Sequence, residues 1–176
     1  MHVSDFDVYI FSLTDSLTSE ERLKNAAAIY TGKGRQQFTK QLLPNGKPYF
    51  PDFADLHFSI SHSGDYWLAA FGSADVGIDL QQHIDCNISQ LARRFFHAQE
   101  NDYLSNCGYA VAEFFRIWAA KESYVKYTGQ GISSFDKFSV IPKLDDAALL
   151  QLEFMPGYSL YLCAQSIGKV NICSFD

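Results

Sequence analysis

Apolar residues recur at two different spacings along the chain, and these spacings separate predicted strands from predicted helices. Alternation with a period of two predicts strands at residues 6–13, 56–60, 66–72 and 75–81. The C-terminal tail continues with four alternating segments, FDKFSV, LLQLEF, YSLYLCA and KVNICSF. The pattern therefore predicts an α+β fold.

Helical spacing marks the segments between these strands. Thr18, followed three residues later by Glu21, forms a capping box at the start of a predicted helix that ends near Gly32. A short helix is predicted around residues 88–96, and a stronger one covers residues 109–127. The buried stripe predicted for the stronger helix consists of Val111, Phe114, Phe115, Trp118 and Val125.

Each half of the chain is thus predicted to contain a strand, then helical segments, then several strands. This arrangement predicts two similar subdomains, residues 1–74 and 75–176, packed as one compact unit. The total of 176 residues, 47% of them hydrophobic, is enough for a sizeable core.

The net charge and the cysteines indicate which partners and which cellular compartment to expect. The net charge of −6 argues against non-specific nucleic-acid binding, although it leaves room for a local basic pocket. The four cysteines show no zinc-site spacing, so we expect reduced thiols in a cytoplasmic protein. We find no signal-peptide pattern and no apolar stretch long enough to span a membrane.

Asp79 and Gln81 are the first candidate site residues. Residues two apart on a strand face the same way, so these oxygen-bearing side chains point together while Ile78 and Leu80 face the core. A carboxylate beside an amide oxygen is half of a site for Mg²⁺, which prefers hard oxygen ligands. A turn or cap residue at a strand end is the alternative interpretation of Asp79.

Glu122 and Lys126 lie four residues apart on the strong helix, on the same face as Trp118. They form either a surface ion pair of little energetic consequence or a carboxylate and an ammonium at the edge of a cleft. In the second case Glu122 is a candidate metal ligand or general base.

Two further segments combine polar groups with tight turns. Ser61 and His62, within HFSISHSG, place a hydroxyl and an imidazole where a strand ends, and such groups suit phosphate oxygens. A polar turn is the alternative, and the absence of a GxSxG elbow argues against a serine hydrolase. The Asn-Gly turn before Lys47 and Pro48 presents a lysine on a stiff loop, either for a nucleotide or as a solvated tip.

The order and spacing of these segments resemble the Sfp-like class of 4'-phosphopantetheinyl transferases. The resemblance runs from about Gly46 to about Phe138, and its most specific parts are the SHSG block and the W-x-x-KES-x-x-K block. It implies two α+β subdomains related by a pseudo-twofold axis, with coenzyme A in the cleft between them. It also implies transfer of phosphopantetheine from coenzyme A to a serine of an apo acyl or peptidyl carrier protein, releasing 3',5'-ADP.

The resemblance also implies roles for the candidate residues. Asp79 and Glu122, with Gln81 beside them, would hold Mg²⁺ on the pyrophosphate, and Glu122 would take the proton of the carrier serine. Lys126 would stabilise the leaving 3',5'-ADP. The remaining candidates would contact coenzyme A: Ser61 and His62 at phosphate oxygens, Lys47 and Pro48 along the nucleotide.

Two features separate this chain from the family pattern. Gln81 stands where the class often has an acidic residue, which leaves the metal site one negative charge poorer. The N-terminal part matches poorly, so the 3'-phosphate has four candidate partners: Lys24, Lys33, Arg35 and Lys40. A non-catalytic family member that binds coenzyme A or a carrier is the alternative function, while an ordinary NTPase is disfavoured because the chain has no Walker loop. We expect a monomer, because the two halves would supply both sides of the cleft.

Overall fold

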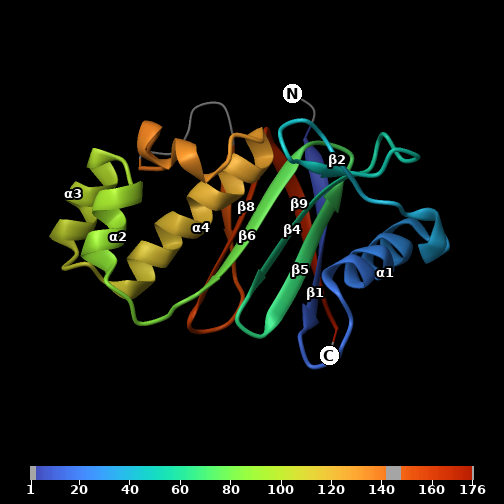
Figure 1. Cartoon of the computed structure of the whole chain (residues 1–176), viewed down its shortest axis with the longest axis horizontal. Helices are drawn as coiled ribbons and strands as arrows, with labels where there is room; N and C mark the ends of the chain where they lie inside the picture. The colour runs from blue at the N-terminus through green and yellow to red at the C-terminus, as the bar shows by residue number, and fades with distance from the viewer. Residues whose placement is uncertain (1–2, 142–147, 176) are drawn as a thin grey trace.

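The computed structural model describes residues 3–141 and 148–175. Figure 1 shows helix α1 on one side of the molecule and helices α2, α3 and α4 on the other, with the long strands between them. The elements of the first half are β1 (Ser4–Ser12), α1 (Ser19–Thr31), the 3₁₀ helix η1 (Arg35–Gln37), β2 (Gln41–Leu42), β3 (Pro48–Tyr49), β4 (His57–Ser63) and β5 (Tyr66–Gly72). The second half contains β6 (Val76–Gln82), α2 (Ile88–Phe95), α3 (Ala98–Asn106), α4 (Val111–Thr128), the 3₁₀ helix η2 (Ile132–Lys137), β7 (Ala148–Leu152), β8 (Tyr158–Ala164) and β9 (Ile167–Phe175).

The two halves share one strand order. In the first half β5 lies between β4 and β1, and in the second β8 lies between β7 and β6. All four of these pairings are antiparallel. The last strand, β9, returns to the first sheet and pairs in parallel with β1. The α+β class is therefore confirmed, and the division at residues 74 and 75 stays a prediction.

The two larger sheets meet edge to edge at β4 and β6, where serine side chains replace a main-chain ladder. The hydroxyls of Ser59, Ser61 and Ser63 accept the backbone N–H groups of Ile78, Leu80 and Gln82 at 3.1, 3.2 and 2.9 Å. The constant offset of 19 residues means that β4 and β6 run parallel. Serines at every second position of β4 therefore hold the two halves in register.

Helix α4 packs directly on the second sheet, and Gly77 on β6 makes this close approach possible. A Cβ atom at Gly77 would clash with the backbone carbonyl of Ser123 on α4. Ile78 and Leu80, on the opposite face of β6, are fully buried in the core between the sheets, as predicted. The glycine of the VGIDL segment is therefore a packing requirement, because any side chain there would lift the helix off the strand.

Most of the predicted elements are confirmed to within a few residues. The capping box of Thr18 and Glu21 is present, and Gly32 and Gly129 end their helices in the left-handed conformation. The strand predicted over FDKFSV is wrong: this stretch begins in η2, because Phe135 packs into the core among the helices. Helix α3 is absent from the sequence predictions, since the capping residue is an imidazole, His97.

Two burial predictions for α4 need correction. Val111 is exposed because it occupies the first turn of the helix, and Trp118 is only half-buried. None of the four cysteines takes part in a disulfide. No helix of residues 3–141 and 148–175 has the length and apolarity needed to cross a membrane.

Candidate active site

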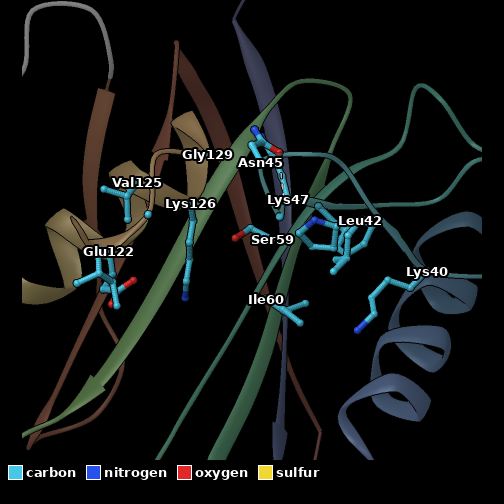
Figure 2. Close-up of a pocket in the computed structure, with 15 residues that line it drawn as sticks. Lys40, Leu42, Asn45, Lys47, Ser59, Ile60, Glu122, Val125, Lys126 and Gly129 are labelled. Carbon is cyan, nitrogen blue, oxygen red and sulfur yellow. Dashed lines mark hydrogen bonds between the residues drawn. The ribbon is translucent and has the colours of Figure 1, made fainter. Parts of the chain in front are cut away.

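A cavity of about 370 Å³ lies between the two halves of the molecule, and Figure 2 shows the side chains around it. The first half contributes the segments around Lys40, Lys47 and Ser59, and α4 contributes Glu122 and Lys126. Lysines therefore predominate among the charged groups of the lining. A locally basic pocket thus exists in a protein whose net charge is −6.

Asp79 is the centre of a polar cluster beside this cavity. Its side chain is almost fully buried on β6. Oδ1 accepts the Lys126 ammonium at 2.6 Å and the Ser61 hydroxyl at 2.8 Å, while Oδ2 accepts the Gln81 amide at 2.8 Å. Asp79 and Gln81 therefore converge as the strand periodicity predicts, but the amide meets the carboxylate through its nitrogen.

Lys126 reaches across from α4 to β6. Besides Asp79, its ammonium contacts the main-chain carbonyl of Ile78 at 3.1 Å. An ammonium has three N–H donors, so these two bonds leave one donor without a partner among the described residues. That remaining donor belongs to a side chain that lines the cavity, where it is placed to receive a ligand.

Glu122 lies one helical turn before Lys126 and lines the same cavity. Its burial, together with the negative charge of Asp79, raises the pKa of Glu122 to about 7, against the opposing influence of Lys126 and of the Trp118 indole. A carboxyl group with a pKa near neutrality exchanges protons readily under ordinary conditions. Of the two readings of Glu122 and Lys126, the structure supports the pair at the edge of a cleft.

Lys47 and Pro48 line the cavity from the opposite side, while their predicted contact with a nucleotide stays a prediction. The Lys47 ammonium is held by Asp75 at 2.5 Å and by the Tyr127 carbonyl at 3.1 Å. Asp75 also contacts His57. Partial burial raises the pKa of Asp75, but the interactions with Lys47 and His57 outweigh this effect and lower the pKa overall. A cation fixed in this way presents its charge at one position without a further conformational cost.

Ser61 and His62 are placed differently from the other candidates. Ser61 lies beneath Asp79 and bonds to that carboxylate and to the backbone of Leu80. His62 is exposed on β4, and neither residue lines the cavity. Of the candidates, Glu122, Lys126, Lys47 and Pro48 therefore line the cavity. Asp79 is not a lining residue, but its hydrogen bonds connect it to Lys126, Gln81 and Ser61. The predicted phosphate contacts of Ser61 and His62 stay predictions.

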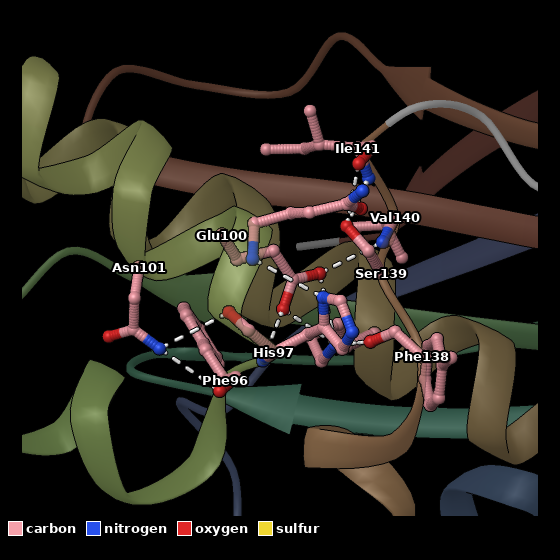
Figure 3. Close-up of polar contacts among 10 residues, drawn as sticks. Phe96, His97, Glu100, Asn101, Phe138, Ser139, Val140 and Ile141 are labelled. Atoms are coloured by element: carbon pink, nitrogen blue, oxygen red, sulfur yellow. Dashed lines mark hydrogen bonds and ion pairs between the residues drawn. The ribbon is translucent and has the colours of Figure 1, made fainter.

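A second ion pair holds α4 from its other side, and Figure 3 shows the network around it. Lys121 and Glu100 are both fully buried, and the ammonium bonds to the two carboxylate oxygens at 2.9 and 2.7 Å. Lys121 also donates to the Phe138 carbonyl at 2.6 Å. Glu100 accepts the backbone N–H groups of His97 at 3.0 Å and Val140 at 2.8 Å. The network fixes the rotation of α4 and thereby keeps Glu122 turned toward the cavity.

The sequence predictions name Lys40 but do not separate it from three other basic candidates. They do not contain the Lys121–Glu100 pair, whose partners are 21 residues apart, or the close approach of α4 at Gly77. Gly77 inside an apolar strand is the one signal that could have been used, because a glycine there often marks a close backbone approach.

A magnesium ion is implied by the resemblance, and the donor chemistry fits it. No cluster of three His, Cys, Asp or Glu side chains suitable for a metal occurs in residues 3–141 and 148–175. Asp79 and Glu122 nevertheless lie close enough for the charge of one to raise the pKa of the other. A divalent cation relieves such repulsion, and Mg²⁺ commonly takes one or two carboxylates with water and substrate phosphates completing its shell.

The sequence of this chain was compared with protein-family profiles and with characterised proteins, and the matches agree on one family. The sequence profile of the 4'-phosphopantetheinyl transferase superfamily matches residues 75–169. The chain is 35% identical over 134 residues to 4'-phosphopantetheinyl transferase Sfp of Bacillus subtilis, a match that covers 68% of this chain and 59% of Sfp. It is 34% identical to the ffp transferase of Bacillus subtilis over 167 residues, covering 86% of this chain and 70% of that protein.

The gsp transferase of Aneurinibacillus migulanus is 40% identical over 141 residues, which cover 72% of this chain and 58% of gsp. The chain therefore spans between 58 and 70% of the length of these relatives. The matched region of the profile contains Asp79, Glu122 and Lys126. This chain belongs to the 4'-phosphopantetheinyl transferase superfamily.

Proposed function

We propose that this protein transfers the 4'-phosphopantetheine group of coenzyme A to a serine of an apo carrier protein. The observation that supports this most is the cavity between the two halves, where lysines face Glu122 and the buried Asp79. Such a site suits a ligand with several phosphates. Family membership supports the same reaction, because relatives of this chain are named 4'-phosphopantetheinyl transferases.

Glu122 is the proposed general base. The serine oxygen of the carrier attacks the phosphorus that bears the pantetheine group, and a new P–O bond forms. The bond between that phosphorus and the oxygen of the departing 3',5'-ADP breaks, and Glu122 accepts the serine proton. A carboxyl whose pKa is about 7 is well matched to this task, because it is partly ionised near neutral pH and still basic enough to take the proton.

Lys126 and Asp79 are the proposed charge-stabilising groups. The one N–H of Lys126 that has no partner among the described residues would donate to an oxygen of the 5'-phosphate of the departing 3',5'-ADP. Asp79 has three of its carboxylate lone pairs occupied, so one on Oδ2 is left to bind a cation, with Gln81 beside it. Bound Mg²⁺ would neutralise the negative charge that builds up on the phosphate oxygens.

The other candidate residues are proposed to bind coenzyme A. Lys47 and Pro48, on the cavity wall, would lie along the nucleotide. Ser61 and His62 would contact phosphate oxygens only if the ligand extends beyond the cavity or if His62 turns toward it, because neither lines it now.

The location, oligomeric state and partners of the protein are also part of the proposal. Four cysteines that form no disulfide support a cytoplasmic location, because reduced thiols persist there. One chain provides both walls of the cavity, which supports a monomer composed of subdomains 1–74 and 75–176. The net charge of −6 argues against non-specific nucleic-acid binding, so coenzyme A and a carrier domain are the proposed partners, and we propose no membrane partner.

A non-catalytic protein that binds coenzyme A or a carrier is the second candidate. Gln81 favours it, because an amide gives the metal site one negative charge fewer than a carboxylate would. The joint presence of Asp79, Glu122 and Lys126 around one cavity supports catalysis instead.

Intact-mass spectrometry of the carrier tests the proposal. The protein is mixed with coenzyme A, Mg²⁺ and a panel of apo carrier domains, and each carrier is paired with its serine-to-alanine variant. We expect a gain of one phosphopantetheine on the serine carriers alone. The Glu122→Gln variant should abolish this gain, whereas Glu113→Gln, the same change elsewhere on α4, should leave it intact. No gain on any carrier with either Mg²⁺ or Mn²⁺ would favour the binding protein.

A further inference from the structure

The three serines of β4 that hold β6 in register, Ser59, Ser61 and Ser63, do not have the same set of contacts. Each of them accepts a backbone N–H group of β6. Ser61 accepts the N–H of Leu80 in this way, and its hydroxyl also donates to Asp79 Oδ1 at 2.8 Å. Ser61 therefore connects the first half of the molecule both to the backbone of β6 and to the carboxylate beside the cavity.

The Ser61 hydroxyl has a single hydrogen to donate. Asp79, paired with the Lys126 ammonium, accepts hydrogen bonds, so the hydrogen between the two side chains belongs to Ser61. An ionised phosphate also needs a hydrogen from its partner, and Ser61 would have to release Asp79 to provide one. Both residues are buried, with 6% of Ser61 and 2% of Asp79 exposed, so water cannot readily take over the bond. The geometry thus favours the carboxylate over a phosphate as the partner of Ser61.

The hydrogen bonds to Asp79 are divided unequally between its two oxygens. Oδ1 accepts Ser61 from β4 and Lys126 from α4, which occupies both of its lone pairs. Oδ2 accepts the Gln81 amide and keeps one lone pair. Two bonds on the same oxygen, from two different elements, restrict rotation of the carboxylate about its Cβ–Cγ bond. The open lone pair of Oδ2 is therefore held in one direction.

We propose that Ser61 is a positioning residue for the metal site, which holds the Asp79 carboxylate so that the open lone pair of Oδ2 stays available to a divalent cation. This inference rests on the proposed function, and it assigns Ser61 to Asp79 in place of a phosphate oxygen. Groups that hydrogen-bond a metal-ligating carboxylate orient it, and the loss of one commonly lowers metal affinity about 10- to 100-fold. Because the same hydroxyl holds Leu80, the orientation of this carboxylate also depends on the register of the two halves.

Titration of the full chain with Mn²⁺ in the presence of saturating coenzyme A tests this inference. Electron paramagnetic resonance measures the free ion, and a sample of coenzyme A alone corrects for the Mn²⁺ that it holds itself. Ser61→Ala should weaken Mn²⁺ binding by about tenfold or more. Ser61→Cys, in which a thiol of similar size is a weaker donor, should also weaken it, and it provides the comparison if Ser61→Ala does not fold.

Ser63→Ala is the matched control. It removes a serine from the same strand and breaks the same kind of bond, to the backbone N–H of Gln82, without removing a donor to Asp79. It should leave the Mn²⁺ affinity within about twofold of the unmodified protein. Equal weakening by Ser61→Ala and Ser63→Ala would show that the register of the strands is responsible, and would overturn the inference.

The dependence of the transfer rate on Mn²⁺ separates positioning of Asp79 from direct contact with a phosphate. Acting through Asp79, Ser61→Ala should need about tenfold more Mn²⁺ for half-maximal transfer, and saturating Mn²⁺ should restore the rate to within about threefold. A serine that donates to a phosphate would be missed at every Mn²⁺ concentration. A loss that persists unchanged at saturating Mn²⁺ would therefore overturn the inference.

The mass assay of the carrier separates this inference from the proposed function. Transfer by the unmodified protein, with equal Mn²⁺ affinity in Ser61→Ala, would reject the role of Ser61 alone. Weaker Mn²⁺ binding by Ser61→Ala, without transfer by the unmodified protein, would support that role and reject catalysis. Absence of Mn²⁺ binding by the unmodified protein would reject the role of Ser61, whatever the mass assay shows.

Discussion

Helix α4 carries two lysines five residues apart, and each pairs with a carboxylate in a different way. Lys121 and Glu100 lie on the side of α3, where both side chains are fully buried. Lys126 and Asp79 lie beside the cavity, where 28% of the Lys126 side chain is exposed while Asp79 is buried. The two pairs share residue chemistry and helix, so their difference must come from their surroundings.

The two pairs differ in how many of their hydrogen-bond donors and acceptors are already used within the protein. Lys121 uses all three N–H donors, and Glu100 accepts four bonds. Lys126 uses two donors, and Asp79 accepts three bonds. The first pair is complete within the protein and has no capacity left for a ligand. The second pair is incomplete in both partners, which is what a site that receives phosphate and a cation requires.

The largest expected effect is on folding, from Lys121→Met. Removing the ammonium leaves Glu100 buried without its counter-charge, which costs about 3–5 kcal/mol of the free energy of unfolding. Chemical denaturation of the variant measures this loss. Glu100→Gln combined with Lys121→Met should recover part of it, and Lys24→Met, which breaks a surface pair, should cost less than about 1 kcal/mol. A cost as small as that of Lys24→Met would show that the buried pair is dispensable.

Lys126→Met should act on transfer more than on folding. We expect the transfer rate to fall by at least about 100-fold, because a donor to the developing phosphate charge is lost. Part of the Lys126 side chain is exposed, so water can take its place beside Asp79, which also keeps the donors of Ser61 and Gln81. The free energy of unfolding should therefore fall by only about 1–2 kcal/mol. Carrier mass assays and denaturation on the same samples check both values. A stability loss as large as that of Lys121→Met, with transfer retained, would reverse the assignment of the two pairs.

The smallest effect concerns Glu122 and depends on pH. Its folded-state pKa of about 7 lies above the ordinary value of 4.5, so the unfolded chain ionises first as the pH rises between them. The free energy of unfolding therefore decreases over this interval. In the absence of metal, Glu122→Gln should be more stable than the unmodified protein at pH 8, by roughly 1–2 kcal/mol or about 3–6 °C. Near pH 4.5 the advantage should vanish.

Glu113→Gln is the control for this pH dependence, because a hydrogen bond from Tyr103 and the neighbouring Arg116 lower the pKa of Glu113. Its effect should have the opposite sign, a small loss of stability at pH 8. Melting curves at both pH values in the presence of a chelator give the comparison. An equal gain for Glu122→Gln at both pH values would mean that ionisation of Glu122 is not the cause.

Local sequence signals predict much of the fold and part of the site. The capping box of Thr18 and the left-handed glycines at 32 and 129 locate helix ends, because those signals act within one turn. The period of two places Asp79 beside Gln81, and the period of four places Glu122 beside Lys126. The same reasoning assigns Ser61 and His62 to phosphate oxygens, because a sequence pattern does not show whether a serine hydroxyl contacts a ligand or the backbone of a neighbouring strand. In the structure the Ser61 hydroxyl accepts the backbone N–H of Leu80.

The sequence by itself determined the α+β class, the helix that carries Glu122 and Lys126, and the family to which the chain belongs, since each depends on residues near one another in the chain. Only the tertiary structure decided that the serines of β4 hold β6 in register and that β9 returns to β1. It also decided that Lys121 pairs with Glu100 and that Lys40 faces the cavity. These choices depend on which distant segments pack together, and packing is set by the whole core rather than by any local pattern.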